Sequence, residues 1–127
     1  MRFGAMCLAG SLLASACGSQ NPMGAPQAPT PTNDSLSRGE SVYRVYECAS
    51  CHEPTALGRI VAPSLAHIGS VAATRRPGMS AEDYIRESIL DPYAHEVPGY
   101  EGFLGRSNPG FLRSDVDVLV EYLLSLK

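Results

Sequence analysis

The segment Cys48-Ala49-Ser50-Cys51-His52 is the most specific pattern in this chain of 127 residues. Two residues separate the cysteines, so the two thiols lie a short, fixed distance apart, and a histidine follows directly. The spacing C-x-x-C-H is the attachment signature of c-type haem, in which both thiols bond to vinyl groups of the porphyrin. The imidazole of His52 then lies beside the iron and is the expected proximal ligand. The sequence therefore predicts one covalently bound haem c, held by Cys48, Cys51 and His52.

Two other kinds of site also use a C-x-x-C pair. Structural zinc needs four Cys or His ligands, but the other two cysteines, Cys7 and Cys17, lie in an N-terminal segment with the features of a targeting signal. His67 and His95 could complete a zinc site on paper, yet no second close pair supports one. A thioredoxin-like redox motif needs a βαβ pattern, and no strand-rich pattern surrounds Cys48. We therefore favour haem attachment over both alternatives.

Residues 1–16 have the pattern of a secretory signal peptide. Arg2 supplies a short positive region, and the apolar stretch that follows has the length of a signal core. Ala14-Ser15-Ala16 matches the small-residue cleavage pattern A-x-A. Because haem is attached covalently outside the cytoplasm, an export signal agrees with the C-x-x-C-H motif. The sequence predicts an exported protein, in the periplasm or on the outer face of the cell membrane.

Cys17 directly follows the expected cleavage site. The segment from Leu12 to Ser19 resembles a bacterial lipoprotein signal, in which this cysteine becomes the lipidated first residue, although Ala14 stands where leucine is usual. The alternative is ordinary cleavage after Ala16, which would leave a reactive free thiol on an exported protein. We favour lipidation of Cys17 and a membrane anchor.

Residues 17–34 have the composition of a tether between that anchor and a folded domain. Prolines recur among Gly, Ser, Thr, Asn and Gln, and no apolar periodicity is present. Such a segment buries too little apolar surface to offset the entropy of ordering it. In an extended proline-rich form it could hold a domain up to about 50 Å from a membrane.

Residues 35–127 form the expected folded domain, which is long enough for only a modest core. The chain has no Trp and three Phe, so the haem would supply a large aromatic body within that core. The formal net charge is −3, and this acidic balance gives no indication of nucleic-acid binding.

Apolar periodicity predicts an all-α domain with three main helices. The first spans 37–47 and begins at a capping-box pattern, Ser37-Arg38-Gly39-Glu40. The second spans 81–90, after a cap at Ser80 and before Asp91-Pro92. The third begins at Ser114, and its apolar stripe has helical spacing. That stripe consists of Val116, Leu119, Val120 and Leu123. The segments 53–78 and 93–113 are rich in Gly and Pro and are predicted to be ordered loops around the cofactor.

These features together resemble the class I c-type cytochromes over nearly all of residues 35–127. Gly39, Tyr43 and the C-x-x-C-H motif are similar to the N-terminal helix of that family, in which a glycine lets the C-terminal helix approach closely. Leu119, Tyr122 and Leu123 resemble the helix that crosses it. The resemblance implies a cytochrome c fold and a carrier of single electrons rather than an enzyme.

Two loops carry the resemblance further. The segment Ala62-Pro63-Ser64-Leu65 is similar to the family's loop after the haem motif, where the proline carbonyl accepts a hydrogen bond from the proximal histidine. Pro63 is therefore expected to orient His52 and to fix its tautomer. The segment from Asp91 to Tyr100 resembles the loop on the distal side of the haem.

The sixth iron ligand is where the chain departs from the family. The family usually places a methionine shortly after the Pro-Gly of the distal loop, and Phe103 or Leu104 occupies that position here. His95 and Met79 are the candidate ligands, and an open or water-bound position is the third possibility. His67 is expected on the surface.

The expected function is that of a membrane-tethered monohaem carrier that passes electrons between respiratory or oxidoreductase partners. An alternative is a haem sensor or ligand-binding module with an open sixth position. A peroxidase-like enzyme is disfavoured, because no acid/base constellation accompanies His95. Arg75 and Arg76 are either a docking patch for an acidic partner or part of a solvated loop.

Overall fold

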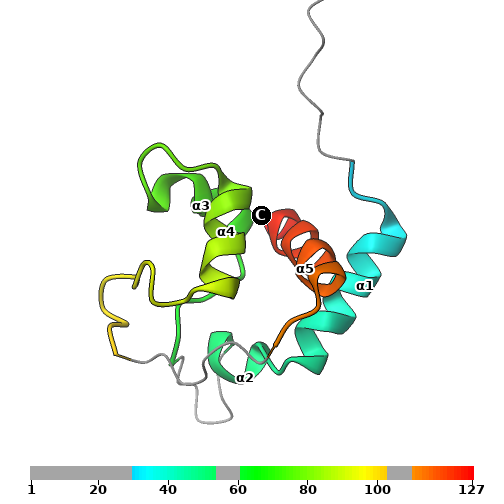
Figure 1. The fold of residues 1–127 in the computed structure, drawn as a ribbon, viewed down its shortest axis with the longest axis horizontal. Helices are drawn as coiled ribbons and strands as arrows, with labels where there is room; N and C mark the ends of the chain where they lie inside the picture. The colour runs from blue at the N-terminus through cyan, green and yellow to red at the C-terminus, as the bar shows by residue number, and fades with distance from the viewer. Residues whose placement is uncertain (1–29, 54–60, 103–109) are drawn as a thin grey trace, which may run out of the picture.

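The computed structural model describes residues 30–53, 61–102 and 110–127, and every regular element in these ranges is a helix. This confirms the prediction of an all-α domain. In Figure 1, α1 and α5 lie on one side of the molecule and α3 and α4 on the other, with α2 near their lower ends. The helices are α1 (Asn33–Val45), α2 (Ala49–His52), α3 (Ile68–Arg75), α4 (Ala81–Leu90) and α5 (Arg113–Ser125).

Helices α4 and α5 follow their sequence predictions closely. Helix α4 has the predicted bounds, and the Ser80 hydroxyl caps it by accepting a hydrogen bond from the Asp83 N–H at 3.0 Å. Helix α5 begins one residue before the predicted start. Its predicted stripe is buried, with Leu119 only 1% exposed. Periodicity therefore identified the face of α5 that forms the core.

The predicted start of the first helix is wrong. Helix α1 begins at Asn33, with Thr32 as its N-cap. The Thr32 hydroxyl accepts a hydrogen bond from the Ser35 N–H at 3.1 Å, and the Ser35 hydroxyl accepts one from the Thr32 N–H at 3.0 Å. Here a serine takes the place of the glutamate in a capping box. Helix α1 therefore includes the last residues assigned to the tether, and Ser37 lies inside it.

Helix α3 corrects the prediction that residues 53–78 contain only loop. Its sequence, IGSVAATR, has a weak apolar pattern, but Ile68 and Ala72 are both buried one turn apart. A Cβ atom on Gly69 would lie 2.2 Å from the Leu124 carbonyl oxygen, so only glycine allows this approach to the end of α5. The Gly69 N–H also donates to the Leu126 carbonyl at 2.9 Å. Packing against α4 and against the end of α5, rather than local propensity, stabilises α3.

The crossing of α1 and α5 forms the centre of the core. A Cβ atom on Gly39 would lie 2.3 Å from the Val118 carbonyl oxygen and 2.5 Å from Tyr122 Cβ. Beside this contact, the rings of Tyr43 and Tyr122 pack with centroids 5.7 Å apart. Gly39 therefore has the role that the resemblance implied for it. In the described ranges, no helix combines the length and apolar character needed to cross a membrane.

Candidate functional site

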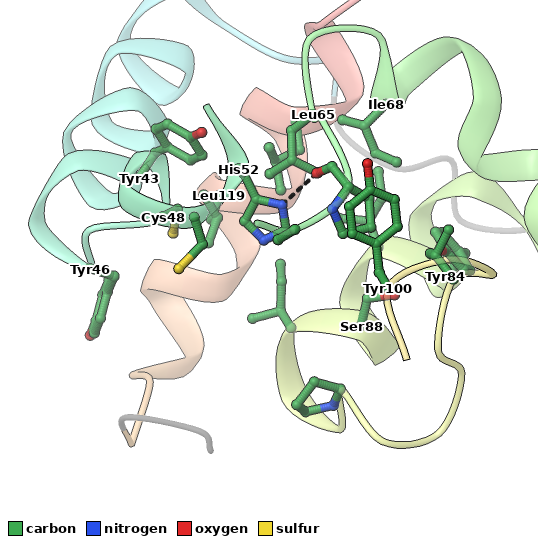
Figure 2. A pocket seen from close by; sticks show the side chains of 18 of the residues that line it. Tyr43, Tyr46, Cys48, His52, Leu65, Ile68, Tyr84, Ser88, Tyr100 and Leu119 are labelled. Carbon is green, nitrogen blue, oxygen red and sulfur yellow. Dashed lines mark hydrogen bonds between the residues drawn. The ribbon is translucent and has the colours of Figure 1, made fainter. Parts of the chain in front are cut away.

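A cavity of about 610 Å³ lies between the two sides of the helical domain. The segments that line it come from the end of α1, from α2, α3, α4 and α5, and from the loops around Pro63 and between Pro92 and Tyr100. Figure 2 shows His52 in this cavity, with Cys48 and Tyr46 on one side of it and Ser88 and Tyr100 on the other. The volume is in the range of pockets that hold small molecules and cofactors.

One helical turn brings the three residues of the C-x-x-C-H motif to this cavity. Helix α2 is short, and the His52 N–H donates to the Cys48 carbonyl oxygen at 3.1 Å. Cys48 and Cys51 are both free thiols, the first half-buried and the second exposed. Burial raises the pKa of the Cys48 thiol. The cavity therefore presents two unpaired thiols and an imidazole close together.

A hydrogen bond fixes the orientation of His52. Its Nδ1 atom lies 2.6 Å from the carbonyl oxygen of Pro63. Because a carbonyl can only accept, Nδ1 donates the hydrogen and Nε2 is left with a free lone pair. Burial lowers the pKa of His52, and the bond to Pro63 opposes this only in part. The neutral imidazole is the form that binds metals, so His52 fits the proximal ligand, and the bond that the resemblance implied is present.

Aromatic residues form the part of the cavity lining that lies beside the cysteines, and their contacts fix its position. The Tyr46 hydroxyl donates to Asp115 Oδ2 at 3.0 Å, and its ring packs on Phe111 with centroids 4.5 Å apart. Nearby, burial raises the pKa of Tyr43, and the Glu53 carboxylate raises it further, so this phenol stays neutral. The Tyr46–Asp115 pair joins residues 69 positions apart, and no local sequence signal identifies it.

The two candidates for the sixth ligand lie in different surroundings. His95 lines the cavity and is half-buried, and its ring meets that of Tyr84 edge-on with centroids 5.9 Å apart. Met79 is not among the lining residues, and it packs against the hydrophobic core. Phe103 and Leu104 lie outside the described residues. The cavity thus brings His95, and not Met79, together with Cys48, Cys51, His52 and Pro63.

The sequence also singled out His67, Arg75 and Arg76. His67 is exposed, as expected. Arg76 forms an ion pair with Glu87, whereas Arg75 is half-buried and lines the cavity. The two arginines therefore do not form one open patch, and neither belongs to a freely solvated loop.

The residues of the cavity fit a covalently bound haem. The two thiols are in place for the vinyl groups, the His52 Nε2 atom is available to iron, and apolar side chains such as Leu65, Ile85 and Leu119 line the walls. Across residues 30–53, 61–102 and 110–127, no three His, Cys, Asp or Glu side chains converge as a metal site of their own. A haem iron would not need such a cluster, because the porphyrin nitrogens would supply most of its ligands and His52 would supply a further one.

Comparison with known proteins gives one match. A family model described as "Cytochrome c" matches residues 36–127, well over half of the chain. No curated protein and no solved structure matches the chain.

Proposed function

Since the chain belongs to the cytochrome c family, and is therefore an electron-transfer protein with covalently attached haem c, we propose that it is an exported, membrane-tethered carrier of single electrons. It would pass electrons between respiratory or oxidoreductase partners and would not itself be an enzyme. The observation that supports this most directly is the hydrogen bond between His52 and Pro63 at 2.6 Å, which holds in a fixed orientation the imidazole that would bind the iron. The haem supplies the chemistry, a one-electron change at its iron.

The surroundings of His52 suit electron transfer. A carrier exchanges electrons fastest when its ligands hardly move between the two redox states. His52 is held by a backbone carbonyl, and the wall beside it is tied to α5 by Tyr46 and Asp115. The same Pro63 bond increases the basicity of the ligand. These contacts favour a fixed site over one that opens on each turnover.

We further propose that His95 is the second axial ligand. It lines the same cavity as His52, and its edge contact with Tyr84 restricts the orientation of the ring. A second imidazole would lower the reduction potential relative to a His/Met pair. An iron with two protein ligands would be six-coordinate in both redox states, as befits a carrier.

The optical spectrum of the reduced protein, with and without carbon monoxide, tests the carrier function and the ligand together. The wild-type spectrum should be low-spin and should not change when carbon monoxide is added. His95→Ala should bind carbon monoxide rapidly, because it opens one axial position. Met79→Leu is the matched control and should leave the spectrum unchanged, since Met79 packs in the core.

A rapid carbon monoxide shift in the wild-type protein would refute the six-coordinate carrier. It would favour the haem sensor or ligand-binding module instead. An unchanged spectrum in His95→Ala would refute His95 as the ligand while leaving the carrier function intact.

Lipidation of Cys17 is the proposed source of the membrane tether. Cys17→Ser should move the protein from the membrane fraction to the soluble exported fraction while keeping its haem spectrum, because the anchor and the haem site are far apart in the chain. The measurement is fractionation of cells, with mass spectrometry of the mature N-terminus. A wild-type mass equal to plain cleavage after Ala16 would contradict the anchor.

A further inference from the structure

The segment 91–102 forms the part of the cavity lining that follows α4. In Figure 1 it is the yellow segment that leaves the end of α4 and extends away from the other helices. The residues of this segment that line the cavity are Pro92, His95, Glu96, Val97 and Tyr100. Within the described ranges, no helix lies in this segment. Its position over the cavity must therefore be fixed by turns and side chains.

The backbone hydrogen bonds of this segment are local. The Ala94 N–H donates to the Asp91 carbonyl oxygen at 3.0 Å, and the Tyr100 N–H donates to the Val97 carbonyl oxygen at 3.0 Å. The second of these closes a turn around Pro98-Gly99, and Gly99 has the positive φ of 90° that a type II turn needs at this place. Each bond spans three residues, so neither joins the two ends of the segment. A segment with so little backbone support opens easily unless side chains hold it.

The side chain of Glu96 supplies a longer connection. Its Oε1 atom accepts a hydrogen bond from the Gly102 N–H at 3.1 Å, across six positions of the chain. Inside this span, Glu101 Oε2 accepts a hydrogen bond from the Gly99 N–H at 2.9 Å. A carboxylate is a stronger acceptor than a neutral oxygen. The bond from Glu96 to Gly102 therefore closes residues 96–102 into a ring around the turn.

His95 directly precedes this ring. Its side chain is restricted from the α4 side by the edge contact with Tyr84, whose ring is 4% exposed and lies in the core. Its backbone is restricted from the other side, because Glu96 is the first residue of the closed ring. Opening of the ring would release the second restriction and leave the first. The position of His95 at the cavity thus depends on a carboxylate that itself has no contact with the imidazole among the printed bonds of the described residues.

We propose that Glu96 is a positioning residue for the side of the haem opposite His52. Its bond to Gly102 keeps residues 96–102 closed and thereby holds His95 at the cavity. This assignment rests on the proposed binding of iron by His95. A ligand carried on a loop is lost each time the loop opens, so Glu96 sets how often an external ligand can reach the iron.

Rapid mixing of the reduced haem-containing protein with carbon monoxide measures this opening, because carbon monoxide can bind only after His95 leaves the iron. Glu96→Ala should increase the observed rate at saturating carbon monoxide by about fivefold, since one charge-assisted hydrogen bond is lost. Glu96→Gln should remain within about twofold of the wild type, because its amide oxygen can accept the same bond. Glu121→Ala is the matched control. It removes one carboxylate from α5, away from the cavity lining, and should leave the rate unchanged.

Amide hydrogen exchange of the same proteins, followed by NMR, gives a readout that does not involve the iron. Glu96→Ala should speed the exchange of the Gly102 N–H, which loses its acceptor, while Glu96→Gln should not. The amides of Leu119 and Val120, in the core of α5, should exchange at the wild-type rate in both variants. Faster exchange at these core amides in Glu96→Ala would show a general loss of stability and would contradict a positioning role.

Two further results would overturn the assignment. One is a six-coordinate wild-type protein whose carbon monoxide rate equals that of Glu96→Ala. The other is a rate that rises equally in Glu96→Ala and Glu96→Gln, which would show an effect of charge and not of the bond to Gly102. A wild-type protein that binds carbon monoxide at once refutes ligation by His95 instead, and exchange of the Gly102 N–H then decides by itself whether Glu96 closes the ring. Failure of this proposal and failure of the six-coordinate carrier are thus distinguished.

Discussion

Replacement of both Cys48 and Cys51 by alanine should leave the chain without covalently bound haem. The two thiols are the only groups at the cavity wall that can bond to the vinyl groups among the described residues, and both are free. Without the haem, a cavity of about 610 Å³ would lack the body that fills it. Loss of packing on this scale costs several kcal/mol, so the apo chain should also accumulate poorly.

Haem staining of a denaturing gel, together with the mass of the chain, measures this loss. Each single variant should retain one thioether bond and bind less haem than the wild type. Ser50→Ala is the matched control. Ser50 lies between the two cysteines, its side chain is exposed, and its hydroxyl donates to the Glu47 carbonyl at 2.7 Å. A double cysteine variant that still carries haem after denaturation would contradict the attachment site.

Gly39→Ala should destabilise the domain, although the same change in an exposed helix stabilises by roughly 0.5–1 kcal/mol. The new methyl group would lie 2.3 Å from the Val118 carbonyl oxygen and 2.5 Å from Tyr122 Cβ. A backbone oxygen and a Cβ cannot rotate away, so α1 and α5 must separate. Overpacking typically costs 1–3 kcal/mol, and we expect a loss of about 3 kcal/mol here.

Denaturant unfolding of the haem-containing protein, monitored by its optical spectrum, measures the loss as a lower midpoint. Ser41→Ala is the control, because it changes the exposed face of the same helix, where the Ser41 hydroxyl bonds only to the Ser37 carbonyl at 2.9 Å. It should shift the midpoint little. An unchanged midpoint in Gly39→Ala would mean that the two helices do not cross at this glycine.

The elements that the sequence predicted well are those whose signals are local. The stripe of α5 and the cap of α4 each lie within one helix, so spacing alone reveals them. Helix α3 was missed because packing against α4 and against the end of α5 stabilises it, and the contact at Gly69 joins distant parts of the chain. The start of α1 was misplaced because Ser37-Arg38-Gly39-Glu40 imitates a capping box, whereas Thr32 and Ser35 form the actual one.

The same distinction applies to the site. Cys48, Cys51 and His52 are adjacent in sequence, so their chemistry could be predicted from their spacing. The place of Pro63 came from a family resemblance, and the structure shows its bond to His52. The location of Arg75 at the cavity could not be predicted, because it depends on α3, which the sequence did not indicate. His95 is a candidate from sequence, and its contact with Tyr84 depends on the tertiary fold.

The pairing of the first and last helices has a consequence for the order of events during maturation. Synthesis proceeds from the N-terminus, so α1 and the C-x-x-C-H motif emerge well before α5. The two ends of this contact, Tyr46 and Asp115, are 69 positions apart. Helix α1 has 13 residues, and an isolated helix of this length is marginal in water. During that interval Cys48 is in an unfolded segment, where the machinery that attaches haem can reach its thiol. The half-buried Cys48 of the finished domain is therefore expected to be bonded before α5 arrives and closes the fold.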